Sequence, residues 1–166
     1  MPDSHYLKEK QVLLGRRIGI LRVKAGFKTK REVDVLFSGP DTKSSVISRL
    51  EKGVSVELRT IVRLANIFKM PVYCFFDFEG KFRVSISEKY SYDLEQRLAS
   101  VKKMLGKNIV KARTEKGWSQ LDLEVASGVD KATIGYFERG SENIKFNSIV
   151  IIAEALGINI WQLFKA

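Results

Sequence analysis

The feature of this sequence that most constrains its fold is an internal repeat. The segment “LGRRIGILRVKAG” at residues 14–26 returns as “LGKNIVKARTEKG” at residues 105–117. Likewise “SVISRLEKG” (45–53) returns as “ATIGYFERG” (132–140), and “TIVRLANIF” (60–68) returns as “SIVIIAEAL” (148–156). The three blocks keep their order, with offsets of 91, 87 and 88 residues. Chance does not readily produce such an order, so we interpret the chain as a tandem duplication with small length changes between the blocks.

Each copy has the pattern of a bundle of about five short helices. In the second copy, apolar residues recur at the three- and four-residue spacing of amphipathic helices. Glycines end the helices and short polar residues begin the next ones. The glycines are Gly117, Gly128, Gly140 and Gly157, and the capping residues are Ser119, Asp130 and Asn159. Two helices separated by about four residues, the first ending at glycine, have helix-turn-helix spacing. We therefore predict a mainly α fold of two tandem five-helix helix-turn-helix domains, at residues 1–79 and 93–166.

Residues 80–92 form the predicted linker between these domains. The segment “EGKFRVSIS” (79–87) alternates Phe82, Val84 and Ile86, which predicts a short strand. This strand either turns back on “FFDF” as a hairpin or pairs with the same strand of a second chain, because an isolated strand leaves its edge unpaired.

A helical pattern follows the linker. The apolar residues Leu94, Leu98, Val101, Leu105 and Ile109 keep helical spacing, so the first helix of the second domain is predicted to begin early, near residue 92. Its additional apolar face must be covered either by the first domain or by a partner chain. Together with the unpaired strand, this face favours a homodimer.

The second copy resembles a known family of regulators. Its segments “SQLDLEVASGVDKATIGYFERG” and “SIVIIAEALGINIWQLF” are similar to the phage-repressor class of helix-turn-helix regulators, the Xre or Cro/cI-type family, over residues 105–164 without a gap. The first copy, residues 14–76, is similar but needs about three extra residues around “FSGPD”. The resemblance implies lambda-repressor-like domains in a sequence-specific regulator that binds double-stranded DNA. Its recognition helices would be residues 43–52 and 131–139.

The resemblance also implies roles for two pairs of charged residues. Arg113 and Glu138 occupy positions whose side chains form an ion pair between the first and third helices in this family, and Arg22 and Glu51 occupy the same positions in the first copy. Each pair is expected to hold a recognition helix in place and not to contact DNA. The alternative is that all four are solvated surface charges.

The expected DNA-facing residues are those on the remaining face of each recognition helix, because major-groove reading uses the first turns of that helix. Arg49 can form two hydrogen bonds to guanine, Ala132 offers only apolar contact, and Gly135 is expected on the exposed side, where it removes bulk. Alternatively, Gly135 lets its helix pack closely on a neighbouring element. The predicted set is Lys43, Ser44, Ser45, Ser48, Arg49 and Lys52 in the first copy, and Lys131, Ala132, Gly135, Tyr136 and Arg139 in the second.

Phosphate contacts are expected where the second helix of each copy begins. Thr29 and Glu32 have the spacing of a capping box, which leaves the backbone amides near Thr29 and Lys30 directed at a phosphate. In the second copy, Ser119 and Gln120 occupy the same place.

Composition restricts the function further. The 166 residues carry a formal net charge of +10, which favours a polyanionic partner. No apolar run approaches the roughly 20 residues of a bilayer span, and the polar start does not resemble a secretory signal, so we expect a cytoplasmic protein without a membrane partner.

The single cysteine, Cys74, lies in the apolar run “VYCFF” and is predicted to be a buried, inert thiol. With one histidine, His5, and no metal-ligand or phosphate-loop spacing, we expect neither an enzyme nor a cofactor.

Two classes of function remain. The favoured one is a DNA-binding transcriptional regulator with two recognition helices per chain. The rival is a protein-interaction or antitoxin-like module in which one helix-turn-helix copy no longer contacts DNA, and the second copy's scarcity of long polar side chains supports it. RNA binding has no aromatic sheet platform or loop motif in its favour.

Overall fold

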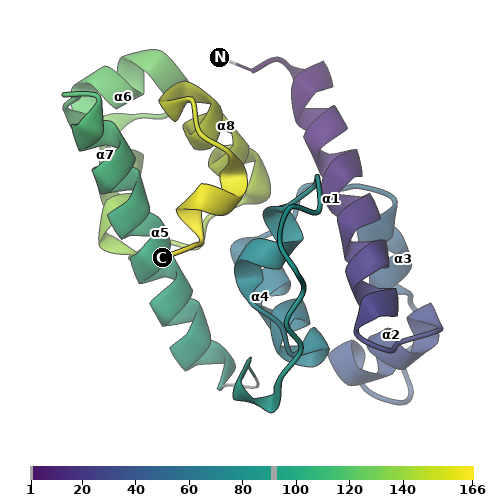
Figure 1. The fold of residues 1–166 in the computed structure, drawn as a ribbon. Coiled ribbons are helices and arrows are strands. Elements are labelled where there is room, and N and C mark those ends of the chain that lie inside the picture. The colour runs from purple at the N-terminus through teal and green to yellow at the C-terminus, as the bar shows by residue number, and fades with distance from the viewer. Residues whose placement is uncertain (1, 91–92) are drawn as a thin grey trace.

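The computed structural model describes residues 2–90 and 93–166, and each half of the chain contains four α-helices followed by a short 3-10 helix (Figure 1). The N-terminal half comprises α1 (Ser4–Lys24), α2 (Lys30–Ser38), α3 (Val46–Glu51), α4 (Leu58–Phe68) and η1 (Val72–Phe76). The C-terminal half comprises α5 (Leu94–Glu115), α6 (Gln120–Ser127), α7 (Lys131–Arg139), α8 (Phe146–Leu156) and η3 (Ile160–Leu163). Between the halves lies η2 (Glu88–Tyr90). The fold is therefore mainly helical, with the same order of elements in both halves.

Short-range sequence signals explain where most helices begin and end. Both α2 and α6 begin at a capping box, formed by Thr29 with Glu32 and by Ser119 with Asp122. Gly128 and Gly140 end α6 and α7 with positive φ angles of 75° and 67°, a conformation that a glycine adopts without strain. These signals fix the short connection, residues 128–130, that separates α6 from α7.

Helix α3 is shorter than the predicted recognition helix 43–52. Its N-cap is Ser45, whose side chain accepts a hydrogen bond from the Ser48 amide, and the helix begins at Val46. Lys43 and Ser44 therefore belong to the connection that precedes the helix. By contrast, α7 begins and ends at the residues predicted for the second recognition helix.

One hydrophobic core runs through both halves. Buried residues of α1 and α4 belong to the same cluster as buried residues of α5 and α8. At the centre, the ring of Phe76 stacks on that of Phe164 with 4.3 Å between centroids and on that of Phe146 at 6.2 Å. The two halves are therefore packed into a single body.

The apolar face of α5 is covered by the N-terminal half of the same chain. Helix α4 packs against α5, Leu98 is buried, and Leu94 and Val101 are half-buried against the core. The buried guanidinium of Arg97 donates hydrogen bonds to the Met70 carbonyl (2.7 Å) and the Asn66 side chain (2.7 Å). Of the two alternatives for this face, the structure has the N-terminal half of the same chain as the cover. The helix begins at Leu94; residue 92, where its start was placed, lies outside the described residues.

The predicted strand in the linker is absent, so that prediction was wrong. Residues 81–87 have no strand pairing, and the one β-bridge among the described residues joins Glu57 to Lys145. Phe82 instead packs edge-on against Trp161 at 4.7 Å and against Tyr73 at 5.6 Å. Val84 also packs against the core, whereas Ile86 is 46% exposed, so only part of the alternating side of this unpaired segment is covered.

Candidate nucleic-acid interface

Helix α7 is fixed by a half-buried ion pair. The Arg113 guanidinium on α5 donates from Nε to Glu138 Oε1 at 2.7 Å and from Nη2 to Oε2 at 3.2 Å, and their side chains are 13% and 7% exposed. Arg113 also donates from Nη1 to the Trp118 carbonyl at 2.7 Å. Gln120 donates from Nε2 to Glu138 Oε2 at 2.8 Å. The start of α6, the end of α5 and the end of α7 are thereby connected through one carboxylate.

Helix α3 is fixed by the corresponding contacts in the N-terminal half. Arg22 Nε donates to Glu51 Oε1 at 2.8 Å, and its Nη1 donates to the Phe27 carbonyl at 2.8 Å. Lys30 Nζ lies 3.2 Å from Glu51 Oε2, in the place that Gln120 takes in the other half. Sequence reasoning assigned Lys30 and Gln120 to phosphate and missed this role. Both follow the N-cap of the second helix, and that shared position is the signal that could have revealed it.

Two glycines allow the first helix of each half to approach the end of the third. A Cβ on Gly15 would lie 2.6 Å from the Glu51 carbonyl oxygen, and a Cβ on Gly106 would lie closer still to the Glu138 carbonyl oxygen. Any larger residue would push the helix away, because real Cβ atoms do not approach backbone that closely. The repeat places the two glycines at an offset of 91 residues, in the first matched block.

An acidic residue on the second helix caps the third helix in both halves. Asp34, only 3% exposed, accepts hydrogen bonds from the Ser45 hydroxyl at 2.8 Å and from the Ile47 amide at 3.0 Å. Glu124 accepts one from the Lys131 amide at 3.1 Å. Both carboxylates face the positive end of a helix, where negative charge is stabilising. Sequence reasoning missed both, although they occupy equivalent positions, 90 residues apart.

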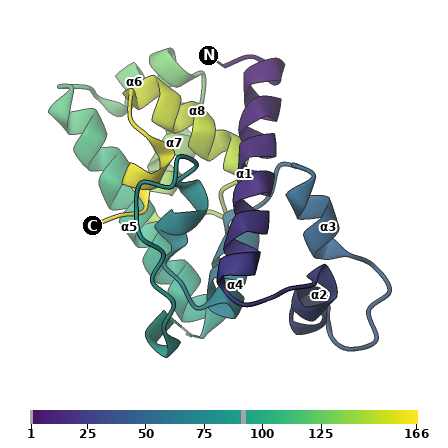
Figure 2. The same cartoon turned by 45° about the vertical axis from the view of Figure 1, so that its right-hand side comes forward.

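The exposed side of α3 carries basic and hydroxyl residues. Arg49 and Lys52 are exposed, whereas Ser48 is half-buried. Within the described part of the chain, no hydrogen bond or ion pair engages the Arg49 guanidinium. Ser45 is occupied as a cap. Lys43 and Ser44 are exposed in the connection at residues 39–45, which extends from the edge of the molecule (Figure 2).

That connection is held in place by Arg31. Its guanidinium donates to the carbonyls of Pro40, at 2.8 Å, and of Thr42. The residues between α2 and α3 therefore form a braced loop before the start of α3.

The exposed side of α7 is more apolar than that of α3. Lys131, Ala132, Tyr136 and Arg139 are exposed. Gly135, however, is buried, so its predicted place on the exposed side was wrong. The Arg139 guanidinium covers it: this group lies 5.1 Å from the Tyr136 ring, and its Nη1 is 3.0 Å from the position of a Cβ on Gly135. Gly135 thus leaves room for the guanidinium against the helix.

The outer face of α6 adds apolar surface beside α7. Leu121 is 56% exposed and Val125 is 81% exposed, and Tyr136 on α7 is 42% exposed. In the N-terminal half, Arg31 occupies the position of Leu121. The C-terminal surface is therefore the less basic of the two.

The capping boxes engage the helix starts that were predicted to meet phosphate. Thr29 donates its amide to Glu32 at 2.8 Å, and Ser119 donates its amide to Asp122 at 2.7 Å. Hydrogen bonds from the backbone and hydroxyl of Ser119 lower the pKa of the Asp122 carboxyl, so this group stays negatively charged at neutral pH. A phosphate at these helix starts would have to approach a carboxylate, so the exposed lysines and arginines are the stronger candidates.

Three further observations concern metal ligands, the cysteine and membrane spans in the described residues. No group of three or more His, Cys, Asp and Glu side chains there could hold a metal ion. Burial raises the pKa of the Cys74 thiol to about 11, as expected for an inert buried cysteine. Among the described helices, none is both long and apolar enough to cross a membrane.

A short connection between α6 and α7, with α7 held at its end by an ion pair from α5, defines a helix-turn-helix protein. Residues 109–160 match the family model described as helix-turn-helix. Over 63 residues, the chain is 32% identical to “Uncharacterized HTH-type transcriptional regulator y4dJ” of Sinorhizobium fredii, an alignment that covers 38% of this chain and 82% of that protein. No solved structure matches the chain. The chain therefore belongs to the helix-turn-helix family.

Proposed function

We propose that this protein is a sequence-specific regulator of transcription that binds double-stranded DNA through α3 and α7. The observation that carries the proposal is that both halves hold their third helix by the same contacts. Each has an arginine–glutamate pair, a glycine at the closest approach and an acidic cap, and each leaves one helix face in solvent. On this view the N-terminal half is a second helix-turn-helix domain, although its sequence match is looser.

The exposed sides of α3 and α7 would have different roles in DNA binding. Arg49 and Lys52, with Lys43 beside them, give the N-terminal surface long charged side chains that reach guanine edges and phosphates. On α7, Ala132 and Tyr136 offer mainly apolar contact, and Lys131 and Arg139 offer charge. We therefore expect the N-terminal half to supply most of the base discrimination.

A salt titration tests the proposal. If six to ten basic side chains meet phosphate, the logarithm of affinity falls with the logarithm of salt concentration at a slope of about −5 to −9. The titration compares a random duplex, the same single strand and a duplex RNA. Preference for the DNA duplex with this slope is expected, whereas a slope near −1, or equal binding to all three, would reject the proposal.

The rival function, a protein-interaction module in the C-terminal half, is favoured by one observation. Leu121, Val125 and Tyr136 place exposed apolar surface where a DNA-binding face should be polar. A pair of matched variants separates the functions. If α7 contacts DNA, Lys131→Ala with Arg139→Ala reduces the magnitude of the salt slope by about 2, as Lys43→Ala with Lys52→Ala should do in the N-terminal half. An unchanged slope for the α7 variant alone would assign its surface to a protein partner.

A further inference from the structure

Two contacts at the centre of the molecule join a residue to its own counterpart in the repeat. Glu57 and Lys145 form an antiparallel bridge, with the Leu58 amide donating to the Ile144 carbonyl at 2.8 Å and the Phe146 amide donating to the Val56 carbonyl at 2.7 Å. Glu57 and Lys145 are 88 residues apart, so they are equivalent positions in the alignment of the two copies. Phe76 and Phe164, which stack at 4.3 Å, are also 88 residues apart. A position contacts its own equivalent only on a two-fold axis.

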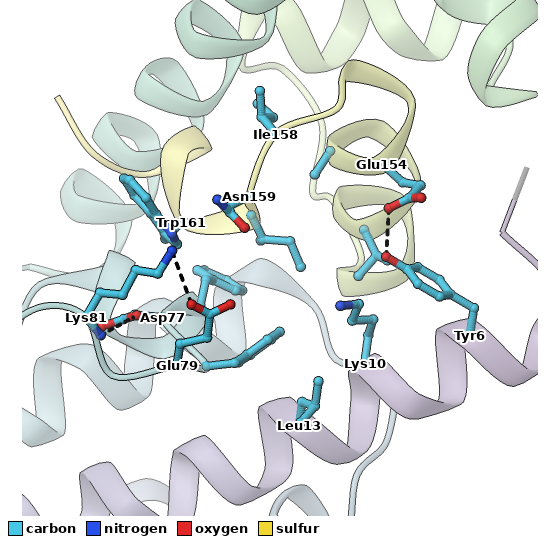
Figure 3. A pocket seen from close by; sticks show the side chains of 15 residues that line it. Tyr6, Lys10, Leu13, Asp77, Glu79, Lys81, Glu154, Ile158, Asn159 and Trp161 are labelled. Carbon is cyan, nitrogen blue, oxygen red and sulfur yellow. Dashed lines mark hydrogen bonds and ion pairs between the residues drawn. The ribbon is translucent and has the colours of Figure 1, made fainter.

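Away from this centre, one contact between the halves occurs twice, once on each side. The Tyr6 hydroxyl on α1 donates to Glu154 on α8 at 2.7 Å, and burial together with this bond raises the tyrosine pKa to about 12 (Figure 3). Arg97 on α5 donates to Asn66 on α4 at 2.7 Å. Tyr6 and Arg97 are equivalent at an offset of 91, and Asn66 and Glu154 are equivalent at an offset of 88. The interface α1–α8 is therefore the counterpart of the interface α5–α4.

Two pockets follow the same relation. Tyr6, Lys10 and Leu13 line one beside α1, together with Phe76, Asn159 and Trp161 (Figure 3). Arg97, Val101 and Met104, at offset 91 from the first three, line the other beside α5. Figure 1 shows the arrangement as a whole: a half-turn in the plane of the view exchanges α1 with α5, α2 with α6, and α4 with α8. The contacts and the views agree on one local two-fold axis.

We infer that the chain is an internal dimer, whose single copy reads one duplex carrying two inverted, non-identical half-sites. This inference rests on the proposed function. A two-fold axis leaves equivalent elements at the same height along it, so α3 and α7 lie at the same height. To read one duplex, their exposed sides must point toward the same end of this axis. Two-fold-related recognition helices read inverted half-sites, and the different residues on α3 and α7 make those half-sites unequal.

The internal dimer also removes the reasons to expect association of two chains. The linker strand that would have paired with a partner is absent, and the apolar face of α5 is buried against α4. Because the two halves are covalently joined, their pairing does not depend on protein concentration. Affinity for the full site should therefore be independent of any assembly step.

A disulfide across the axis tests the geometry. Glu57 and Lys145 lie between the two bridging hydrogen bonds, where Cα atoms are about 4.5 Å apart, within the range of a disulfide. Neither side chain caps its helix, and the native Cys74 is buried. The double variant Glu57→Cys/Lys145→Cys is compared with itself in oxidised and reduced form, and each single variant serves as a control.

The internal dimer predicts an intrachain disulfide in a monomer of 18.9 kDa. The oxidised form should bind duplex within about twofold of the reduced form, since a pre-organised interface loses nothing when fixed. Disulfides formed only between chains, or a loss of affinity beyond about tenfold on oxidation, overturn the inference.

Stoichiometry separates this inference from the proposed function. Sedimentation or native mass spectrometry of the wild-type chain on its selected duplex should give one chain per two half-sites. Two chains on that duplex overturn the internal dimer while leaving DNA binding intact. No complex with any duplex overturns the proposed function and the inverted-site reading together, and the disulfide result then decides the internal two-fold by itself.

Discussion

Helices α2 and α3 in the N-terminal half are joined by residues 39–45, whereas α6 and α7 in the C-terminal half are joined by residues 128–130. Despite the longer connection, Asp34 reaches the start of α3 as Glu124 reaches the start of α7. The added residues are accommodated outside the contact and are held there by Arg31. Length can therefore change in the connection as long as the acidic cap reaches its helix.

The two halves differ most where nothing inside the protein constrains them. The positions where the first helix meets the third keep an arginine, a glutamate and a close glycine, because each of these residues contacts another part of the fold. The exposed position that holds Arg49 in one half holds Tyr136 in the other. Ser48 and Gly135 are equivalent, and the glycine accommodates the Arg139 guanidinium. The scaffold is thus shared, while the surface offered to a ligand is specific to each half.

The largest expected effect comes from removing the shared carboxylate. Glu138→Ala leaves the half-buried Arg113 with only the Trp118 carbonyl and should lower the free energy of unfolding by about 2–3 kcal/mol, because hydrogen bonds to a charged group are lost. Glu51→Ala should do the same through Arg22. Urea unfolding measures both, with exposed Glu142→Ala as a control expected within about 0.5 kcal/mol of wild type. Losses below about 1 kcal/mol for both variants would contradict a structural role for the pairs.

Substituting the glycines where the first and third helices approach most closely should have the next largest effect on stability. Gly106→Ala and Gly15→Ala force a methyl group against a carbonyl oxygen and should each cost about 1–3 kcal/mol of stability. Gly135→Ala is the matched control, because its methyl group meets only the mobile end of Arg139 and gains about 1 kcal/mol of helix propensity. If thermal unfolding ranks Gly135→Ala with the other two, the close helix approach is not what these glycines provide.

Substitutions on the exposed sides of α3 and α7 should change DNA affinity to different extents and leave stability unchanged. Arg49→Ala should weaken binding to the best site by about 1–3 kcal/mol and relax the preference at one base pair. Tyr136→Ala, the corresponding change on α7, should cost less, because it removes only apolar contact. Fluorescence anisotropy on single-substituted duplexes measures both. An equal loss on every sequence would make Arg49 a phosphate contact, and no loss would remove it from the interface.

The acidic caps should give the smallest effects. Glu124→Ala removes one hydrogen bond at the start of α7 and should cost about 1 kcal/mol. Asp34→Ala removes two, from a buried position, and should cost about 2 kcal/mol. Glu124→Gln keeps an acceptor oxygen and should fall between Glu124→Ala and wild type in chemical unfolding. Equal stability of all these variants would show that the caps do not hold the third helices.

The sequence was sufficient where a signal is local or repeated. Capping residues and glycines located α7, and the two matched arginine–glutamate positions lie at the pairs that the structure forms. Other features depend on what packs nearby. The start of α3 is set by Asp34 from another helix, Gly135 is buried by the rotamer of Arg139, and the segment at Phe82 lacks a strand to pair with. None of these is visible in a one-dimensional pattern.

The contact between the halves was also beyond sequence reasoning, although its parts were present. The repeat supplies equivalent positions, but the alignment does not state which of them touch. Only the fold shows that residue 57 meets residue 145 and that Phe76 meets Phe164. The fold also shows that the apolar face of α5 is covered within the chain. This is why we expect one chain to bind both half-sites.

The most direct test of the account is selection of bound sequences from a random duplex pool, carried out with wild type and with Arg49→Ala. We predict an inverted pair of half-sites with unequal information content, of which only the half-site read by α3 changes in the variant. A pool enriched in one half-site, in direct repeats, or in a perfect palindrome that the variant alters symmetrically would contradict it.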